Sequence, residues 1–306
     1  MNSTWDHMDM FKDAFIKNFV LVFVAIIFNY ISGTLVFIFF TNQIFYTEPR
    51  YILYFNMVIN DMVMLTLTVA IHVGSYIWPL FKMPVCCIVT IISLITHMNT
   101  PLNLAGMAIE RYIAICDPLH HAEVCTVRRT YIALAITWGV AAVPAFSDLV
   151  ITLAMQPLSF FSTAILCFIS NVFTTPYHEV RVTAVQVIYI SFVWLTLIYT
   201  YFRVLFVAKT ASTDPISAQK AHNTILLHAL QVMLSMLSYV TPWCNAFLLQ
   251  SFPEQRTTIL FLTFFIGSVL PRLLSPLVYG IRDQKLFMYM KGYFPCRLSV
   301  VKVRPT

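Results

Sequence analysis

Seven continuous apolar runs, each long enough to cross a lipid bilayer as a helix, dominate the chain. A spanning helix needs about 20 mostly apolar residues, and polar breakers such as Asp117-Pro118 separate the runs. The runs cover residues 19–40, 51–78, 85–115, 130–153, 182–207, 225–249 and 257–279. This pattern predicts an all-α integral membrane protein, a bundle of seven transmembrane helices.

The composition excludes the main alternatives to such a bundle. Of the 306 residues, 59% are hydrophobic and only 10% are charged. A soluble domain carries about 45–50% apolar and about 25% charged residues. A transmembrane barrel would show segments of about 10 residues that alternate between apolar and polar positions. The spans leave room only for short loops, so we expect an extracellular N-terminus at 1–18, the transmembrane domain at 19–281, and a cytoplasmic amphipathic helix and tail at 282–306.

The positions of Lys and Arg predict the orientation of the bundle. With the N-terminus outside, thirteen basic residues lie on the cytoplasmic side and five on the outer side, as the positive-inside rule requires. The polar first 18 residues lack the basic start and apolar run of a signal peptide. Asn2 begins an Asn-Ser-Thr sequence, which an outside N-terminus would expose for N-glycosylation.

Three of the seven cysteines lie on the predicted outer side. Cys86 and Cys87 begin the third run, and Cys167 lies in the loop between the fourth and fifth runs. Both places face an oxidising compartment, in which disulfides persist. We therefore expect one disulfide, for which we favour Cys86 with Cys167. Cys87 is the alternative partner, and free buried thiols are the alternative to any bridge.

Two charged residues, Asp61 and Arg272, lie within the second and the seventh runs. Charges inside a membrane are costly and usually serve a function, so we expect both to face the bundle interior, near enough to pair. In the alternative, water, backbone carbonyls, Ser275 and Thr100 satisfy each charge separately. The eight histidines are scattered, and no His-Glu-x-x-His helix occurs, so we expect no metal site, no cofactor and no enzyme activity.

Four motifs follow one another along the spans. They are Glu48-Pro-Arg-Tyr51, MAIERYIAICDPLH at 107–120, KAHNTILLH at 220–228 and SPLVYGIR at 275–282. Their order and spacing, from about residue 20 to residue 290, resemble those of vertebrate olfactory receptors of the fish type, within the rhodopsin-like (class A) G-protein-coupled receptors. The chain departs from the family pattern where Glu110 replaces Asp, Ile109 replaces Tyr, Ser275 replaces Asn, and Ser32 stands at or near another Asn.

The resemblance implies an odorant receptor at the plasma membrane. Its partners would be a small-molecule odorant, an olfactory-type stimulatory G protein that raises cyclic AMP, and membrane lipids, with no nucleic acid. Glu110 would hold Arg111 at rest and release it to the G protein on activation; taken alone, this pair also fits an interfacial anchor. The resemblance assigns coupling and activation to Glu110, Arg111, Tyr112, Tyr201, Ser275, Pro276 and Tyr279.

The odorant would bind in the outer half of the bundle, where spans three, five, six and seven converge. A mostly apolar lining with a few polar groups is typical of small-molecule pockets. The same side chains at helical spacing are also typical of ordinary packing. The candidates are Ser93, His97, Met98, Val185, Gln186, Tyr189, Met233, Met236, Tyr239 and Phe265.

The segment 282–294 after the last span has the pattern of an amphipathic helix on the inner leaflet. Its apolar residues Leu286, Phe287, Met290 and Phe294 would face the acyl chains. Cys296 beside this helix would be a palmitoylation site.

The resemblance also raises the question of a bound cation. Other receptors of the class hold a sodium ion at the acid that matches Asp61. Here Asp61, Thr100 and Arg272 would form an intramembrane polar network, in which Arg272 would supply the positive charge in place of sodium.

Two other functions fit the seven spans less well. A transporter or channel would need several lumen-facing charges, discontinuous glycine-rich spans and repeat symmetry, and the chain has only seven glycines. A receptor of the same fold for a non-odorant ligand is the main alternative. A peptide ligand would require a more charged outer mouth than this chain offers.

Overall fold

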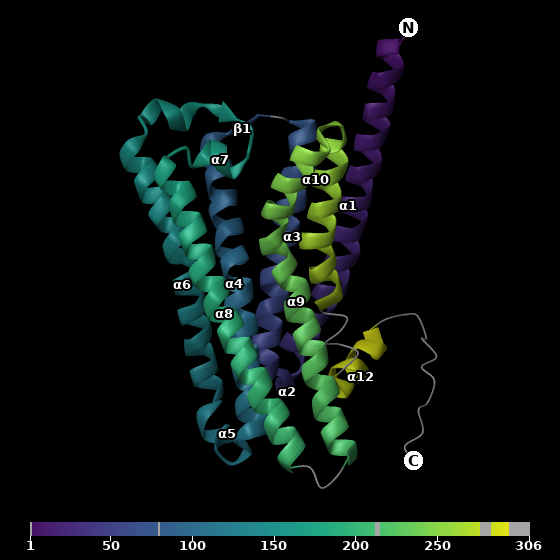
Figure 1. Cartoon of the computed structure of the whole chain (residues 1–306), viewed down its shortest axis with the longest axis vertical. Helices are drawn as coiled ribbons and strands as arrows, with labels where there is room; N and C mark the ends of the chain where they lie inside the picture. Colours follow the sequence, from purple (N-terminus) through teal and green to yellow (C-terminus); the bar gives the residue numbers. More distant parts are fainter. Residues whose placement is uncertain (1, 79, 212–214, 276–282, 294–306) are drawn as a thin grey trace.

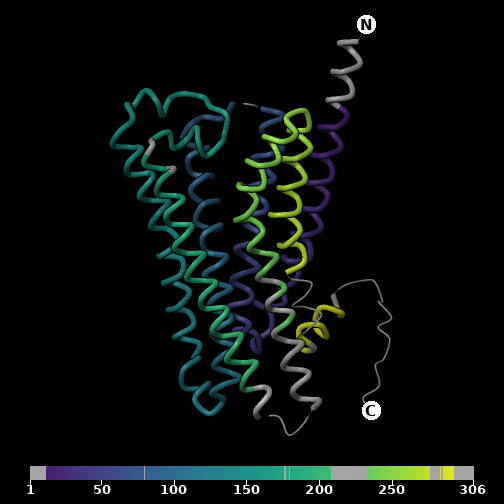
Figure 2. Tube along the Cα trace, in the orientation of Figure 1, coloured from purple at the N-terminus to yellow at the C-terminus, as the bar shows by residue number. Residues whose placement is uncertain are grey.

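The protein is a bundle of long helices that run up and down between two ends (Figure 1). The computed structural model describes residues 2–78, 80–211, 215–275 and 283–293. Pro276, Tyr279, Phe294 and Cys296, named above, lie outside the described residues. Figure 2 follows the chain along each long helix from one end of the bundle to the other.

The long helices correspond to the predicted spans. Within the described residues, six are long and apolar enough to cross a membrane, and α9 contains the remaining run, 225–249. The helices are α1 (Asn2–Thr41), α2 (Gln43–Tyr46), α3 (Pro49–Ile77), α4 (Met83–Cys116), α5 (Pro118–Val124), α6 (Val127–Met155), α7 (Ile169–Val172), α8 (Pro176–Ala211), α9 (Pro215–Ser251), α10 (Arg256–Phe264) and α12 (Gln284–Tyr293). Short turns are η1 (Leu158–Ser162) and η2 (Pro253–Gln255), and the π-helical turn η3 (Phe265–Val269) continues α10 into a helical segment that reaches Ser275.

One end of the bundle carries a small two-stranded sheet. Strand β1 (Phe81–Lys82) pairs antiparallel with β2 (Ala164–Ile165), with Phe81 opposite Ile165. This pairing ties the long connection between α6 and α8 to the start of α4. We call this the disulfide end, because it carries the cysteine bridge described below, and the opposite end the α5 end. The first helix begins at the disulfide end, while α2, α5 and α12 lie at the α5 end (Figure 1).

Helix α4 forms the centre of the bundle, in contact with α3, α6 and α8. In the most apolar 18-residue stretch of α4, 56% of the residues are buried, against 33% or fewer in the corresponding stretches of the other five spans. Those other spans carry large apolar side chains on their outer faces, such as Phe37, Ile136 and Phe192. Such a surface would aggregate in water, whereas a lipid bilayer requires it.

The turn η3 lies so close to α9 that only a glycine fits between them. A Cβ atom on Gly267 would clash with Thr241 Oγ1. Thr241 stands next to Pro242, a proline inside α9, where the helix loses a backbone hydrogen bond. The close approach and the proline therefore occur at the same level of the bundle.

We expect Gly267→Ala to lower the free energy of unfolding by about 1–3 kcal/mol, because overpacking strains a filled interface. Thermal unfolding of the purified protein measures the effect. Gly139→Ala is the matched control, since a Cβ there meets nothing within 4 Å and alanine favours a helix. Adding Thr241→Ala to Gly267→Ala should restore stability. Equal midpoints for Gly267→Ala and the unchanged chain would contradict the packing argument.

Candidate functional site

The first cluster lies at the α5 end, where α4 ends. Glu110 is 6% exposed, and its Oε2 atom lies 3.6 Å from Arg111 Nε. Its Oε1 atom lies 3.2 Å from Nε2 of His121 in α5. One buried carboxylate is therefore shared between the arginine and a histidine from the adjoining short helix. Sequence reasoning missed His121.

Two other expectations at this end can be compared with the structure. The ring of Tyr112 lies 5.9 Å from the ring of Tyr199 in α8. The ring of Tyr201, the residue named from the sequence, lies 6.1 Å from the ring of its neighbour Phe202.

Cys125 lies in the connection between α5 and α6. Burial, and then the negative charge of Glu110, raise the pKa of its thiol. A raised pKa makes the reactive thiolate form of this cysteine rarer.

The second cluster occupies the middle of the bundle. Arg272 Nε lies 3.7 Å from Asp61 Oδ1, and both side chains are 6% exposed. The two charges therefore face the interior and each other. The expected Thr100 belongs to the same region: it hydrogen-bonds to Asp61, and its hydroxyl also accepts a hydrogen bond from Asn60 at 2.9 Å. Ser275 Oγ lies 4.0 Å from Met57 Sδ.

The third cluster collects part of the predicted ligand site. The ring of His97 lies 4.5 Å from that of Tyr239, whose hydroxyl donates to the His97 carbonyl oxygen at 2.7 Å. These residues join α4 to α9. Five of the predicted ligand residues pack in or against one hydrophobic cluster: Met98, Val185, Tyr189, Met236 and Tyr239.

The remaining ligand candidates are less closely associated with that cluster. Phe265 packs against a different cluster, formed by α1, α3 and Val269. Met233 is 60% exposed. Ser93 Oγ is buried without a hydrogen-bond partner in the structure, and Gln186 is half-buried. The structure thus brings together the candidates around His97 and Tyr239, and places Phe265 apart from them.

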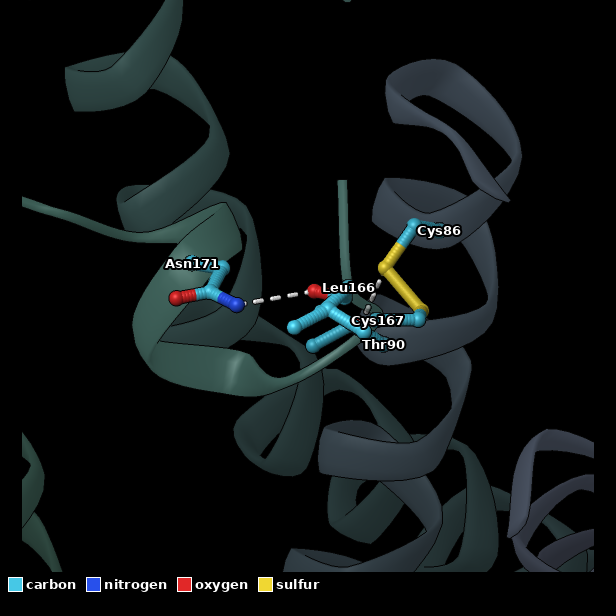
Figure 3. Close-up of a disulfide and its surroundings, with 5 residues drawn as sticks. All are labelled: Cys86, Thr90, Leu166, Cys167 and Asn171. Atoms are coloured by element: carbon cyan, nitrogen blue, oxygen red, sulfur yellow. Dashed lines mark hydrogen bonds between the residues drawn. A yellow bond between two sulfur atoms is a disulfide. The ribbon is translucent and has the colours of Figure 1, made fainter. Parts of the chain in front are cut away.

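A disulfide joins Cys86 of α4 to Cys167 in the connection before α7, with Cα atoms 5.5 Å apart. Figure 3 shows the bridge beside the turn in which Asn171 donates to the carbonyl oxygen of Leu166, at 2.9 Å. Cys87 is free and buried. Of the two neighbouring cysteines, the structure therefore pairs the one favoured from the sequence.

A buried charge cluster that sequence reasoning missed lies at the disulfide end of α6. Asp148 has a side chain that is 2% exposed, and its Oδ2 atom pairs with Arg181 and, at 2.9 Å, with Nδ1 of His178. Both partners belong to the start of α8, and the His178 ring packs on Phe173 at 5.1 Å. Asp148 lies within an apolar run, and this signal could have identified it as a functional or structural charge.

Helix α12 is held by the first of the four motifs. The Tyr51 hydroxyl donates to Asp283 at about 3.0 Å, and the backbone N–H of Leu286 donates to Asp283 at 3.0 Å. Lys285 lies 3.6 Å from Glu48. Asp283 thus caps the first turn of α12 and anchors it to the start of α3.

The orientation expected for α12 was wrong at Leu286. This side chain is fully buried and belongs to the main hydrophobic cluster, against which Met290 also packs. At Leu286 and Met290 the apolar face of the helix therefore contacts protein. The Tyr51–Asp283 anchor explains the difference, because it holds α12 close under the bundle.

Comparison with known proteins gives consistent matches. The sequence pattern of the family described as "7 transmembrane receptor (rhodopsin family)" matches residues 32–279. Odorant receptor 131-2 of Danio rerio is 30% identical over 276 residues, which cover 89% of this chain and 84% of the relative. Human Olfactory receptor 51E1 is 29% identical over 193 residues, or 60% of this chain and 58% of the relative. Human Olfactory receptor 10A7 is 27% identical over 196 residues, with the same two shares.

Proposed function

Because the chain belongs to the rhodopsin family of seven-transmembrane receptors, we propose that it is an odorant receptor that signals through a heterotrimeric G protein. The observation that carries the proposal is the arrangement at the α5 end, where the buried Glu110 lies beside Arg111. The family is one of receptors and not an enzyme class. The match covers 84% of the length of the zebrafish odorant receptor named above and 58% of that of human Olfactory receptor 51E1.

We propose that the disulfide end faces the outside of the cell at the plasma membrane. The charge distribution supports this orientation, since more basic residues then lie inside. The bridge between Cys86 and Cys167 supports it too, because disulfides persist in an oxidising compartment. Asn2 would then be available for glycosylation, and Cys296, if palmitoylated, would lie at the inner leaflet.

The odorant would bind towards the disulfide end, around His97 and Tyr239. Their contact links α4 to α9, so a molecule that inserts there would change how these two helices pack. Phe265 packs against a different cluster and is left out of this site. The other proposed ligand residues are Ser93, Met98, Val185, Gln186, Tyr189, Met233 and Met236. The mixture of apolar side chains with one histidine and one tyrosine fits a small, largely apolar odorant with one hydrogen-bonding group.

Activation would open the α5 end. At rest Glu110 holds Arg111; in the active state Arg111 would contact the G protein, stabilised by Tyr112, Tyr201, Ser275, Pro276 and Tyr279. An odorant that binds the open state more tightly would shift the balance towards it. Pro242 in α9 and Pro276 are sites where the inner ends can bend. The partner would be a stimulatory, olfactory-type G protein, so that activation raises cyclic AMP.

Cells that express the receptor with this G protein provide the test. We expect Arg111→Ala to reduce basal and odorant-evoked cyclic AMP to background, because the contact to the G protein is removed. Arg128→Ala is the control, since Arg128 is an exposed basic residue at the same end. Surface expression is matched by flow cytometry. Equal signals from Arg111→Ala and the unchanged receptor would reduce Arg111 to an interfacial anchor and remove the support for coupling at this site.

A further inference from the structure

The pair formed by Asp61 and Arg272 joins the second and seventh spans through two buried charges. Both side chains are 6% exposed, and Arg272 Nε lies 3.7 Å from Asp61 Oδ1. Placing one charge in the interior without an opposite charge is costly. The pair as a whole is neutral, so each member compensates the other.

Contacts with its own helix and with α3 hold the Arg272 side chain. In the π-helical turn η3 the Leu270 N–H donates to the carbonyl oxygen of Phe265, five residues earlier. The Ser268 carbonyl oxygen accepts from Arg272 Nη1. Arg272 Nη2 reaches Met64 Sδ at 2.9 Å, and Met64 lies one helical turn after Asp61 on α3. The guanidinium is therefore held against one turn of α3.

Asn60 and Thr100 hydrogen-bond to the Asp61 side chain, and the polar groups around it also bond to one another. Asn60 Nδ2 donates to the Thr96 carbonyl oxygen at 3.1 Å and to Thr100 Oγ1 at 2.9 Å. Asn99 Nδ2 donates to Asn60 Oδ1 at 3.2 Å. Among the described residues, the other buried acids are Glu110 and Asp148, and each already has basic partners. Asp61 therefore contributes one negative charge, which Arg272 already balances.

The site fits a mobile cation poorly for this reason. A sodium ion on the Asp61 carboxylate would stand close to the guanidinium. Two unit positive charges about 4 Å apart in a protein interior repel enough to weaken binding by about a thousandfold. The sodium ion that other receptors of the class hold at the matching acid is therefore disfavoured here.

We infer that Arg272 is the built-in cation of this receptor: its guanidinium neutralises Asp61 in place of sodium. The stability of the receptor is then independent of sodium. Removing the guanidinium leaves a buried carboxylate that needs a mobile cation, so that loss of Arg272 creates sodium dependence.

Thermal unfolding of the purified full-length receptor tests this inference without relying on odorant or G protein. The midpoint is compared in sodium chloride and in choline chloride at equal ionic strength. We expect no difference for the unchanged receptor. For Arg272→Met we expect a lower midpoint in choline chloride, raised by about 2–4 °C in sodium chloride because the ion binds only the folded state. Arg272→Gln is the second variant, should Arg272→Met not fold.

The double variant Asp61→Asn/Arg272→Met is the matched control, because it removes both charges and should show no response to sodium. A midpoint of the unchanged receptor that rises in sodium chloride would overturn the inference. So would an Arg272→Met or Arg272→Gln receptor that unfolds at the same temperature in both salts. Failure of the coupling test with Arg111 would leave these outcomes unaffected.

Discussion

Replacing Asp148 with alanine should strongly destabilise the receptor, by about 3–5 kcal/mol, because it leaves buried positive charge without a partner. Asp148 pairs with Arg181 and lies 2.9 Å from His178, and all three side chains are 10% exposed or less. The cluster connects the disulfide end of α6 to the start of α8. We expect a lower unfolding midpoint and little receptor at the cell surface.

Two comparisons isolate the charge from the loss of side-chain volume. Val150→Ala shortens an exposed side chain of the same helix and should leave stability unchanged. The double variant Asp148→Leu/Arg181→Met replaces the ion pair by apolar groups, a change that is often neutral or stabilising, and should recover most of the loss. If Asp148→Ala unfolds at the temperature of Val150→Ala, the cluster does not stabilise the bundle.

The spans could be predicted because the membrane imposes a simple rule on sequence. Continuous apolar runs mark the part of each helix that meets lipid. In the part of the chain that the structure describes, each run coincides with a long helix, except that Trp78 follows the end of α3. The observed helix ends differ from the predicted span ends where a helix continues outside the apolar run. Helix α9 begins at Pro215, ten residues before the run at 225–249, since polar residues in water can also be helical.

The charge pairs show which part of a site sequence can supply. Asp61 and Arg272 are both unusual within apolar runs, so each directs attention to the other. Asp148 also lies in such a run, but its partners stand 30 and 33 residues away, at the start of the next span. Pairing with them depends on how α6 and α8 pack, which no local pattern specifies.

The same limit applies to surfaces that meet protein and not lipid. An amphipathic pattern gives α12 an apolar face but does not say what covers it. In the structure the bundle covers Leu286, and the Tyr51–Asp283 contact anchors the helix there. His121 likewise becomes a partner of Glu110 through the turn that follows α4. Both residues depend on tertiary contacts between short and long helices.

Loss of the disulfide is expected to have the second large effect. The bridge connects residues 81 positions apart, and it fastens the connection before α7 to the start of α4. Removing a native disulfide typically costs about 2–5 kcal/mol. Cys86→Ser, Cys167→Ser and the double variant should therefore lower surface expression and the unfolding midpoint by similar amounts, because each breaks the same bond.

Cys87→Ser is the control that separates this bond from the other cysteine nearby. Consecutive residues of an α-helix point about 100° apart, and Cys87 is buried as a free thiol, so it should not replace Cys86 as the partner of Cys167. We expect Cys87→Ser to behave like the unchanged receptor, measured by flow cytometry of an N-terminal tag and by thermal unfolding. If Cys87→Ser is as damaging as Cys86→Ser, or if Cys86→Ser is harmless, the bridge does not hold the disulfide end together.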